Sequence, residues 1–112
     1  MTPSRDDTST LLRGTLGLLI LRTLELQPLH GLAIADRIAQ VTRGTFRVPA
    51  GSLFPALHRL EQGGWIRGDW TFTGDGRRVK TYSLTAPGRR KLATEQRNWA
   101  RTVAAMSQVL GS

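Results

Sequence analysis

The sequence contains no cysteine, only two histidines and only eight acidic residues among 112 positions. The absence of cysteine excludes disulfide bonds, thiolate catalysis and cysteine-ligated zinc or iron–sulfur sites. His30 and His58 do not lie in a nucleophile, metal-ligand or phosphate-loop motif. The sequence therefore predicts that the chain is not an enzyme and that it holds neither a metal ion nor another cofactor.

Long hydrophobic runs are also missing. Residues 11–26 form the most apolar stretch, but Arg13, Arg22 and Glu25 interrupt it, and a bilayer span needs about 20 mostly apolar residues. Residues 1–10 carry two aspartates and one arginine, whereas a signal peptide begins with a basic segment and ends at a small-residue cleavage site. We therefore expect a cytoplasmic protein with no membrane partner.

Acidic residues are outnumbered two to one, because 16 lysines and arginines give a formal net charge of +8. The excess is clustered: residues 67–91 hold seven cations and only two anions, Asp69 and Asp75. A clustered excess favours a polyanionic partner, with nucleic acid ahead of an anionic membrane surface. The cations of this segment are Arg67, Arg77, Arg78, Lys80, Arg89, Arg90 and Lys91.

The N-terminal half of the chain has helical periodicity. Apolar residues recur at spacings of three and four in several segments, and glycine, proline or polar turns separate these segments. Pro55 is best tolerated in the first turn of a helix, so Ser52 is a candidate N-cap. The helices are predicted at residues 10–26, 31–41 and 51–62.

The C-terminal half has strand signals followed by one long helix. Residues 65–72 and 79–84 are rich in aromatic and β-branched side chains, and glycine and aspartate between them indicate a turn at residues 73–77. Thr85 is a candidate N-cap for a helix that ends near Leu110. Trp65, Trp70, Phe72 and Tyr82 are expected to pack beneath this hairpin.

The predicted element order is α-α-α-β-β-α, which is mainly helical with a small β-hairpin. Two short helices followed by a basic hairpin are typical of a winged helix-turn-helix, whose third helix enters the major groove of DNA. A chain of 112 residues fits one such domain. We divide it into a flexible segment at residues 1–9, a winged helix at 10–84 and a C-terminal helix at 85–112.

Three segments resemble the PadR family of bacterial winged-helix transcriptional regulators. They are LHGLAI at residues 29–34, GSLFPALHRLE at 51–61 and GRRVKTYSLT at 76–85. The order and spacing of these motifs agree with the family, and GTL at residues 14–16 matches its first helix. Three positions depart from the family: His30 and Phe54 stand where tyrosine is common, and Pro49 replaces a polar cap.

The resemblance implies a homodimeric repressor that often senses a small molecule, in the short form with one C-terminal helix. It implies a bacterial protein that is associated with the nucleoid when bound to a pseudo-palindromic operator in double-stranded DNA. Dimerisation would use the two end helices, whose broad apolar faces are visible in the sequence. The dimerisation residues are predicted to be Leu12, Leu16, Leu19, Leu92, Gln96, Trp99, Val103, Met106 and Leu110.

The candidate DNA-binding residues lie at the start of the third helix and in the hairpin turn. Small residues at a helix N-terminus let the backbone approach a phosphate, although Ser52 could serve only as an N-cap. Arginine can bind guanine or phosphate, although Arg59 could equally be solvated. The predicted DNA-binding residues are His30, Ala50, Gly51, Ser52, Phe54, Pro55, His58, Arg59, Gly76, Arg77, Arg78 and Lys80.

Trp99 is the candidate ligand-binding residue. Two copies near a dimer axis could enclose a planar hydrophobic effector, because flat molecules stack well on indole. Leu16 and Val103 would complete such a site. The alternative, which we rank ahead, is that Trp99 belongs to the dimer core.

The sequence thus predicts a sequence-specific DNA-binding transcriptional regulator, a homodimeric repressor released by an effector or another signal. Two alternatives stay open. One is a sequence-tolerant nucleic-acid-binding or architectural protein that uses the same basic hairpin. The other is a winged helix that mediates protein interactions.

Overall fold

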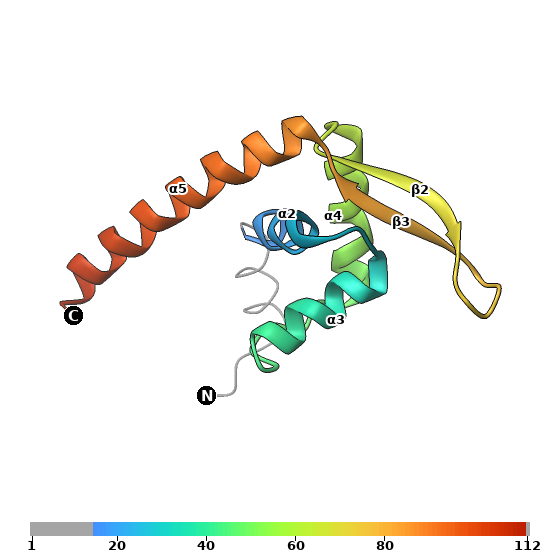
Figure 1. Cartoon of the computed structure of the whole chain (residues 1–112). Helices are drawn as coiled ribbons and strands as arrows, with labels where there is room; N and C mark the ends of the chain where they lie inside the picture. Colours follow the sequence, from blue (N-terminus) through green and yellow to red (C-terminus); the bar gives the residue numbers. More distant parts are fainter. Residues whose placement is uncertain (1–14, 112) are drawn as a thin grey trace.

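The computed structural model describes residues 15–111, so the predicted segment 1–9, the start of the first helix and Leu12 lie outside the described residues. Within them, a helical body carries a hairpin on one side and a long helix on the other (Figure 1). This is the predicted winged helix-turn-helix. The elements are α2 (Leu16–Leu26), β1 (Leu29–His30), α3 (Gly31–Val41), α4 (Ala50–Gln62), β2 (Ile66–Phe72), β3 (Arg78–Leu84) and α5 (Ala86–Leu110).

The sheet has three antiparallel strands in the order β1-β3-β2, not the two that were predicted. β1 pairs Leu29 with Tyr82 and His30 with Thr81. Two residues are too few to display the alternation by which a strand is recognised in sequence. β1 forms because β3, which is distant in the sequence, leaves one edge unpaired by β2. The prediction of a two-stranded sheet was therefore wrong.

The helix boundaries follow local chemistry. α3 has the predicted bounds, and the Thr85 hydroxyl accepts a hydrogen bond from the Gly88 N–H at 3.0 Å, which confirms the predicted N-cap of α5. α4 begins earlier than predicted, because the Ser52 and Leu53 N–H groups both donate to the Pro49 carbonyl, at 3.0 and 2.9 Å. Ser52 is therefore inside the helix, and its assignment as N-cap was wrong.

The core lies where α2 meets the other elements. Ile20 and Leu21 of α2 are buried, and α3, α4 and β2 surround them with further buried aliphatic side chains. α5 joins this core only through its first turns, where Leu92 is 1% exposed. The most completely buried large side chains are Ile20, Leu21, Ile34, Leu53, Leu57, Ile66 and Leu92.

The start of α5 is fixed against the backbone between α4 and β2. The Thr85 hydroxyl donates to the carbonyls of Gly64 and Trp65, at 2.7 and 2.9 Å. Gly88 is buried there, and a Cβ atom at this position would lie 1.9 Å from the Trp65 carbonyl oxygen. Only glycine therefore allows this close approach of α5.

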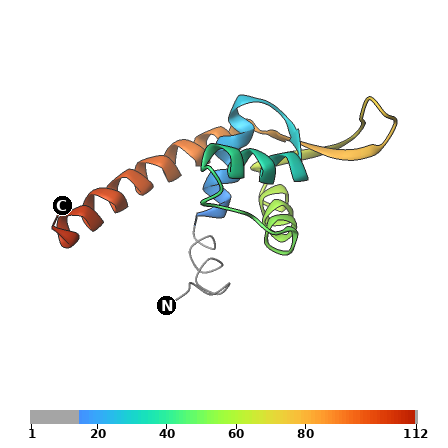
Figure 2. The same cartoon turned by 90° about the horizontal axis from the view of Figure 1, so that it is seen from below.

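The rest of α5 projects away from the body, on the side opposite the hairpin (Figure 2). Its 25 residues correspond to about 37 Å of helix. The molecule is accordingly elongated, with principal extents of 53 × 34 × 22 Å. No helix among residues 15–111 combines the length and the hydropathy needed to cross a bilayer.

Candidate nucleic-acid interface

The N-terminal half of α4 is exposed along one side. Leu53 and Leu57 point into the core, which leaves Gly51, Pro55 and Arg59 at the surface. Ala50 and His58 are also exposed, and Ser52 is half-buried. The first N–H groups of a helix carry a partial positive charge, and in α4 those of Ala50 and Gly51 precede the ones that donate to Pro49. This side of α4 can therefore receive a phosphate or the edge of a base.

Phe54 and His30 have structural partners near this surface. The Phe54 side chain is 44% exposed, yet its ring edge covers Gly31, where a Cβ atom would lie 2.8 Å from Phe54 Cε1. His30 is the N-cap of α3, because its Nδ1 accepts a hydrogen bond from the Ala33 N–H at 3.3 Å. This bond leaves Nε2 of His30 to contact a ligand.

The hairpin of β2 and β3, called the wing below, ends in a tight turn. The Thr73 N–H donates to the Arg77 carbonyl at 2.8 Å, and Gly76 takes a φ of +85° that glycine adopts without strain. Arg77 is exposed, with its Nε 3.7 Å from Asp75 Oδ2. A hydrogen bond from the Thr73 hydroxyl holds the pKa of Asp75 below its ordinary value, so the turn carries a carboxylate beside its arginine.

Lys80 differs from the arginines of the turn because it is tied to α4. Its Nζ lies 2.9 Å from Glu61 Oε1, and both side chains are about two-thirds buried. This bond raises the pKa of Lys80, and burial raises the pKa of Tyr82 beneath it. Gly68 gives the lysine room, since a Cβ atom there would lie 2.4 Å from Lys80 Cε. Lys80 thus links the wing to α4, and its predicted contact with DNA would have to compete with Glu61.

Two aromatic residues of the wing are exposed, contrary to the prediction that they pack beneath it. Trp70 is 59% exposed and Phe72 is 74% exposed, because the hairpin extends beyond the body at these positions. Tyr82 is buried as predicted, and Trp65 packs against the edge of the core. The guanidinium of Arg78 lies 4.3 Å from the centre of the Trp70 ring.

The turn between α3 and α4 contributes two arginines that the sequence reasoning missed. Arg43 has a φ of +52°, and the Arg47 guanidinium covers Gly44, where a Cβ atom would lie 2.9 Å from Nη2. Both arginines are exposed, and Arg47 precedes the first turn of α4 by only three residues. The signal in the sequence is the pair of arginines between two predicted helices.

The predicted dimerisation residues that the structure describes comprise a buried pair, one half-buried residue and an exposed stripe on α5. Leu16 and Leu92 are 5% and 1% exposed and pack in the core of a single chain, so their assignment to a dimer surface was wrong. Leu19 is half-buried on α2. The others continue the face of Leu92 along the projecting part of α5 and are exposed: Gln96, Trp99, Val103, Met106 and Leu110.

Of the three residues predicted to bind a ligand, one chain brings together only two, Trp99 and Val103. Trp99 and Val103 lie one turn apart on the exposed stripe of α5, at 48% and 43% exposure. Leu16 is enclosed by the core and cannot line a site with them. Any pocket around Trp99 would therefore need a second molecule.

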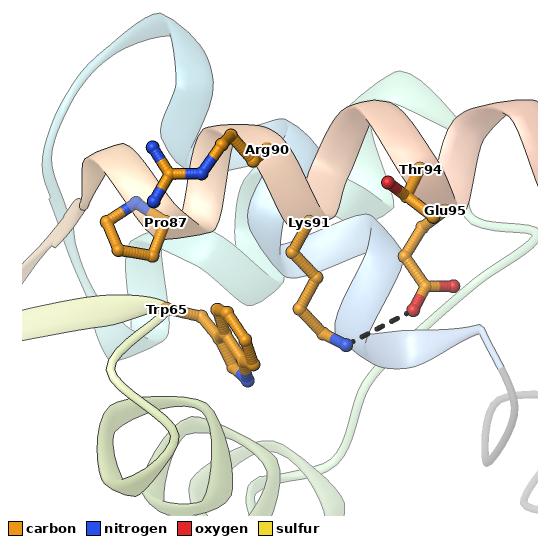
Figure 3. Close-up of a pocket in the computed structure, with 6 residues that line it drawn as sticks. All are labelled: Trp65, Pro87, Arg90, Lys91, Thr94 and Glu95. Atoms are coloured by element: carbon orange, nitrogen blue, oxygen red, sulfur yellow. Dashed lines mark hydrogen bonds and ion pairs between the residues drawn. The ribbon is translucent and has the colours of Figure 1, made fainter.

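A shallow pocket of about 320 Å³ lies at the start of α5 (Figure 3). Trp65 and Pro87 form its walls, and Lys91 crosses it, with its Nζ 4.9 Å from the centre of the Trp65 ring and 3.3 Å from Glu95 Oε1. The pocket adjoins the C-terminal end of α4, about 18 Å along that helix from its N-terminal end. The basic run that includes Arg90 therefore lies at the opposite end of α4 from the helix N-terminus.

No group of three or more histidine, aspartate or glutamate side chains is placed to hold a metal ion within the described part of the chain.

The comparison with protein families identifies one family. A model described as the transcriptional regulator PadR-like family matches residues 20–94. An uncharacterized protein X of Lysinibacillus sphaericus is 28% identical over 92 residues, which cover 82% of this chain and 84% of that protein.

Two solved structures illustrate the similarity of fold. A transcriptional regulator from Clostridium thermocellum has a TM-score of 0.82 at 23% identity, with 89% of this chain and 97% of that one covered. A PadR family transcriptional regulator from Eggerthella lenta has a TM-score of 0.78 at 29% identity, with 90% and 86% covered.

Proposed function

The chain belongs to the PadR-like family of transcriptional regulators, and on this premise we propose that it is a homodimeric repressor that binds a pseudo-palindromic operator and is released by a small molecule. Membership of this family shows that the chain regulates transcription and binds DNA. The repressor role, the dimer, the effector and the residues that contact DNA are the proposal.

One observation carries the proposal: the exposed side of α4 and the cationic turn of the wing belong to the same folded body. The first is the N-terminal half of α4 with Arg59, and the second is the wing turn with Arg77 and Arg78. The ion pair between Glu61 and Lys80 connects α4 to β3. In this arrangement the wing binds phosphates, which supplies most of the affinity, and α4 reads base edges in the major groove.

The proposed dimer rests on the projecting part of α5. Its apolar stripe is exposed in the single chain, although Leu92 on the same face is buried. An exposed apolar stripe that continues a buried one is typical of an interface. A twofold dimer would present two α4 helices to successive half-sites, about one helical turn of DNA apart.

The dimer can be tested by light scattering. We expect a mass of twice the 12.4 kDa of one chain at micromolar concentration. Val103→Glu combined with Met106→Glu should give a monomer, because it places charge on the exposed stripe. A monomeric wild-type protein would contradict the proposed symmetry.

The proposed effector site is the same stripe in the dimer, where Trp99 of each chain would flank the axis. A planar hydrophobic molecule stacked between them would change the separation of the two α4 helices. The Trp99 side chain is half exposed in one chain, so it remains accessible until a second chain or a ligand covers it.

The operator-binding function can be tested by fluorescence anisotropy. The labelled duplex comes from the upstream region of the protein's own gene, a scrambled duplex is the control, and both are titrated across a salt series. Preference for the native duplex by about 10³-fold, with affinity that falls steeply with salt, supports the proposal. Equal binding favours a sequence-tolerant binder, and no binding at low salt favours a protein-interaction module.

Gly51→Ala should separate stability from DNA binding. Apart from the adjacent residues and the backbone of its own helix, no atom of residues 15–111 lies within 4 Å of a Cβ atom built at this exposed position. Alanine should therefore stabilise α4 by about 0.5–1 kcal/mol. If the DNA backbone approaches here, the same methyl group should weaken binding about tenfold, or ~1.4 kcal/mol. Thermal unfolding and anisotropy measure the two effects, and unchanged affinity would show that the DNA stays away from Gly51.

A further inference from the structure

The two exposed aromatic residues of the wing share one face with its buried base. In an antiparallel pair, residues directly opposite each other point to the same side of the sheet. The pairs Ile66–Leu84, Gly68–Tyr82, Trp70–Lys80 and Phe72–Arg78 follow one another along the hairpin. Ile66 and Tyr82 are buried by the body, whereas Trp70 and Phe72 continue the same face into solvent.

This face is turned toward α4. Lys80 stands directly opposite Trp70 in the register, and its Nζ reaches Glu61 of α4 at 2.9 Å. The opposite face of the hairpin carries Asp69 and Thr71, which pair with Thr81 and Val79. The aromatic face therefore lies on the side of the sheet where the helix proposed to read the major groove is packed.

The charges around the two rings favour an anionic partner. The Arg78 guanidinium lies 4.3 Å from the centre of the Trp70 ring. The two carboxylates of the wing are engaged with other arginines: Asp69 with Arg67 at 3.0 Å, and Asp75 with Arg77 at 3.7 Å. Two apolar rings and an arginine are thus presented together, next to the cationic turn.

The minor groove of DNA matches this combination. Its walls are deoxyribose rings, which offer apolar surface, and its potential is negative. Proteins that bind there insert arginine together with apolar side chains at base steps. A neutral protein surface would leave the arginines beside the rings without a counter-charge.

We propose that Trp70 and Phe72, with Arg78 stacked on Trp70, form a contact site for the minor groove of duplex DNA beside the α4 site. The proposal rests on the proposed DNA-binding function. Phe72 contacts the sugars and base edges at a step next to the phosphates held by the turn. Trp70 holds the Arg78 guanidinium flat, in position to enter the groove. The wing thereby contributes sequence preference as well as charge neutralisation.

Phe72→Ala supplies the test, because it removes apolar contact without changing charge. Alanine loses the apolar surface that Phe72 would bury against the sugars and base edges, so we expect about tenfold weaker binding of the labelled upstream duplex. The slope of log affinity against log salt should stay at the wild-type value, since Phe72 neutralises no phosphate. Arg77→Ala should instead lower that slope.

Thr71→Val is the matched control, because it alters the neighbouring residue on the opposite face. Valine keeps the β-branched shape and removes only the hydroxyl that is hydrogen-bonded to Thr81 at 2.7 Å. Its DNA affinity should equal that of the wild type. Thermal unfolding should be unchanged for Phe72→Ala, since that side chain is exposed.

Inosine in place of guanine in the DNA beneath the wing provides a second readout. It removes the guanine amino group from the minor groove and leaves the major-groove edge of the base pair unchanged. We expect the wild-type protein to bind the inosine duplex more tightly, and Phe72→Ala to bind both duplexes equally. The absence of a gain for the wild type would overturn the minor-groove assignment, and an identical gain for both proteins would exclude Phe72 from the contact.

The outcomes also separate this proposal from the proposed function. If the wild type binds DNA and Phe72→Ala binds equally well, the aromatic site is wrong and the DNA-binding function stands. If Thr71→Val loses as much affinity as Phe72→Ala, the cause is the strand itself, and the aromatic site is again wrong. If the wild type binds neither duplex at low salt, the proposed function fails and this inference fails with it.

Discussion

Replacing Arg77 and Arg78 together by alanine is expected to weaken DNA binding by about 10²-fold or more. A hydrogen bond from a charged donor contributes about 1.5–3 kcal/mol, and each 1.4 kcal/mol corresponds to a factor of ten in affinity. Both side chains are exposed at the end of the wing, so little of this loss should come from unfolding. Anisotropy at fixed salt measures the effect.

The salt dependence identifies the origin of that loss. Each cation that displaces a counterion from the DNA contributes about 0.9 to the slope of log affinity against log salt. Arg77 at a phosphate and Arg78 in the minor groove together account for up to about 1.8 per wing. Asp75→Asn is a control that should change the DNA affinity in the opposite direction. It keeps an oxygen that can accept from Thr73 and removes the carboxylate 3.7 Å from Arg77, so it should strengthen binding. A double alanine variant with wild-type affinity and slope would exclude the wing turn from the DNA interface.

Gly88→Ala is expected to cause the largest loss of stability. The added methyl group would meet the Trp65 carbonyl oxygen at 1.9 Å and Leu84 Cδ1 at 2.8 Å. Backbone atoms cannot move aside as a flexible side chain can, so α5 must shift and draw Leu92 from the core. Overpacking typically costs 1–3 kcal/mol. At about 3 kcal/mol, the melting temperature of a domain this size falls by roughly 12–24 °C.

Gly74→Ala is the matched control for that substitution. Apart from the adjacent residues, no atom in the described part of the chain lies within 4 Å of a Cβ atom at Gly74. Surface substitutions of this kind usually change stability by less than about 0.5 kcal/mol. Thermal unfolding followed by circular dichroism measures both variants. Equal melting temperatures for the two would mean that α5 does not pack closely against Trp65.

Features with local causes could be predicted from the sequence. The bounds of α3 follow from its apolar spacing and the Thr42–Arg43–Gly44 segment that closes it, and the wing turn follows from its glycines and Asp75. The cap at Thr85 needed only a hydroxyl three residues before the N–H of Gly88. These interactions span a few residues, so their signal is contained in a short window of sequence.

Features that depend on distant contacts could not be predicted. The alternation of Trp70, Phe72 and Tyr82 indicates the face of a strand, but it does not indicate where the helical body ends beneath that face. Leu92 and Trp99 occupy equivalent positions of one heptad pattern, yet the first is buried and the second is exposed. The ion pair between Glu61 and Lys80 joins residues 19 positions apart and has no local signature.

The pairing of β1 with β3 has a consequence for folding during synthesis. Leu29 can find its partner Tyr82 only after most of the chain has been made, and Leu92 enters the core later still. Contacts between such distant residues form slowly, because a long loop must close before they can stabilise the fold. We expect the nascent chain to gain its tertiary structure only after residue 92 leaves the ribosome. A nascent chain that stops before Leu92 would lack one side of its core.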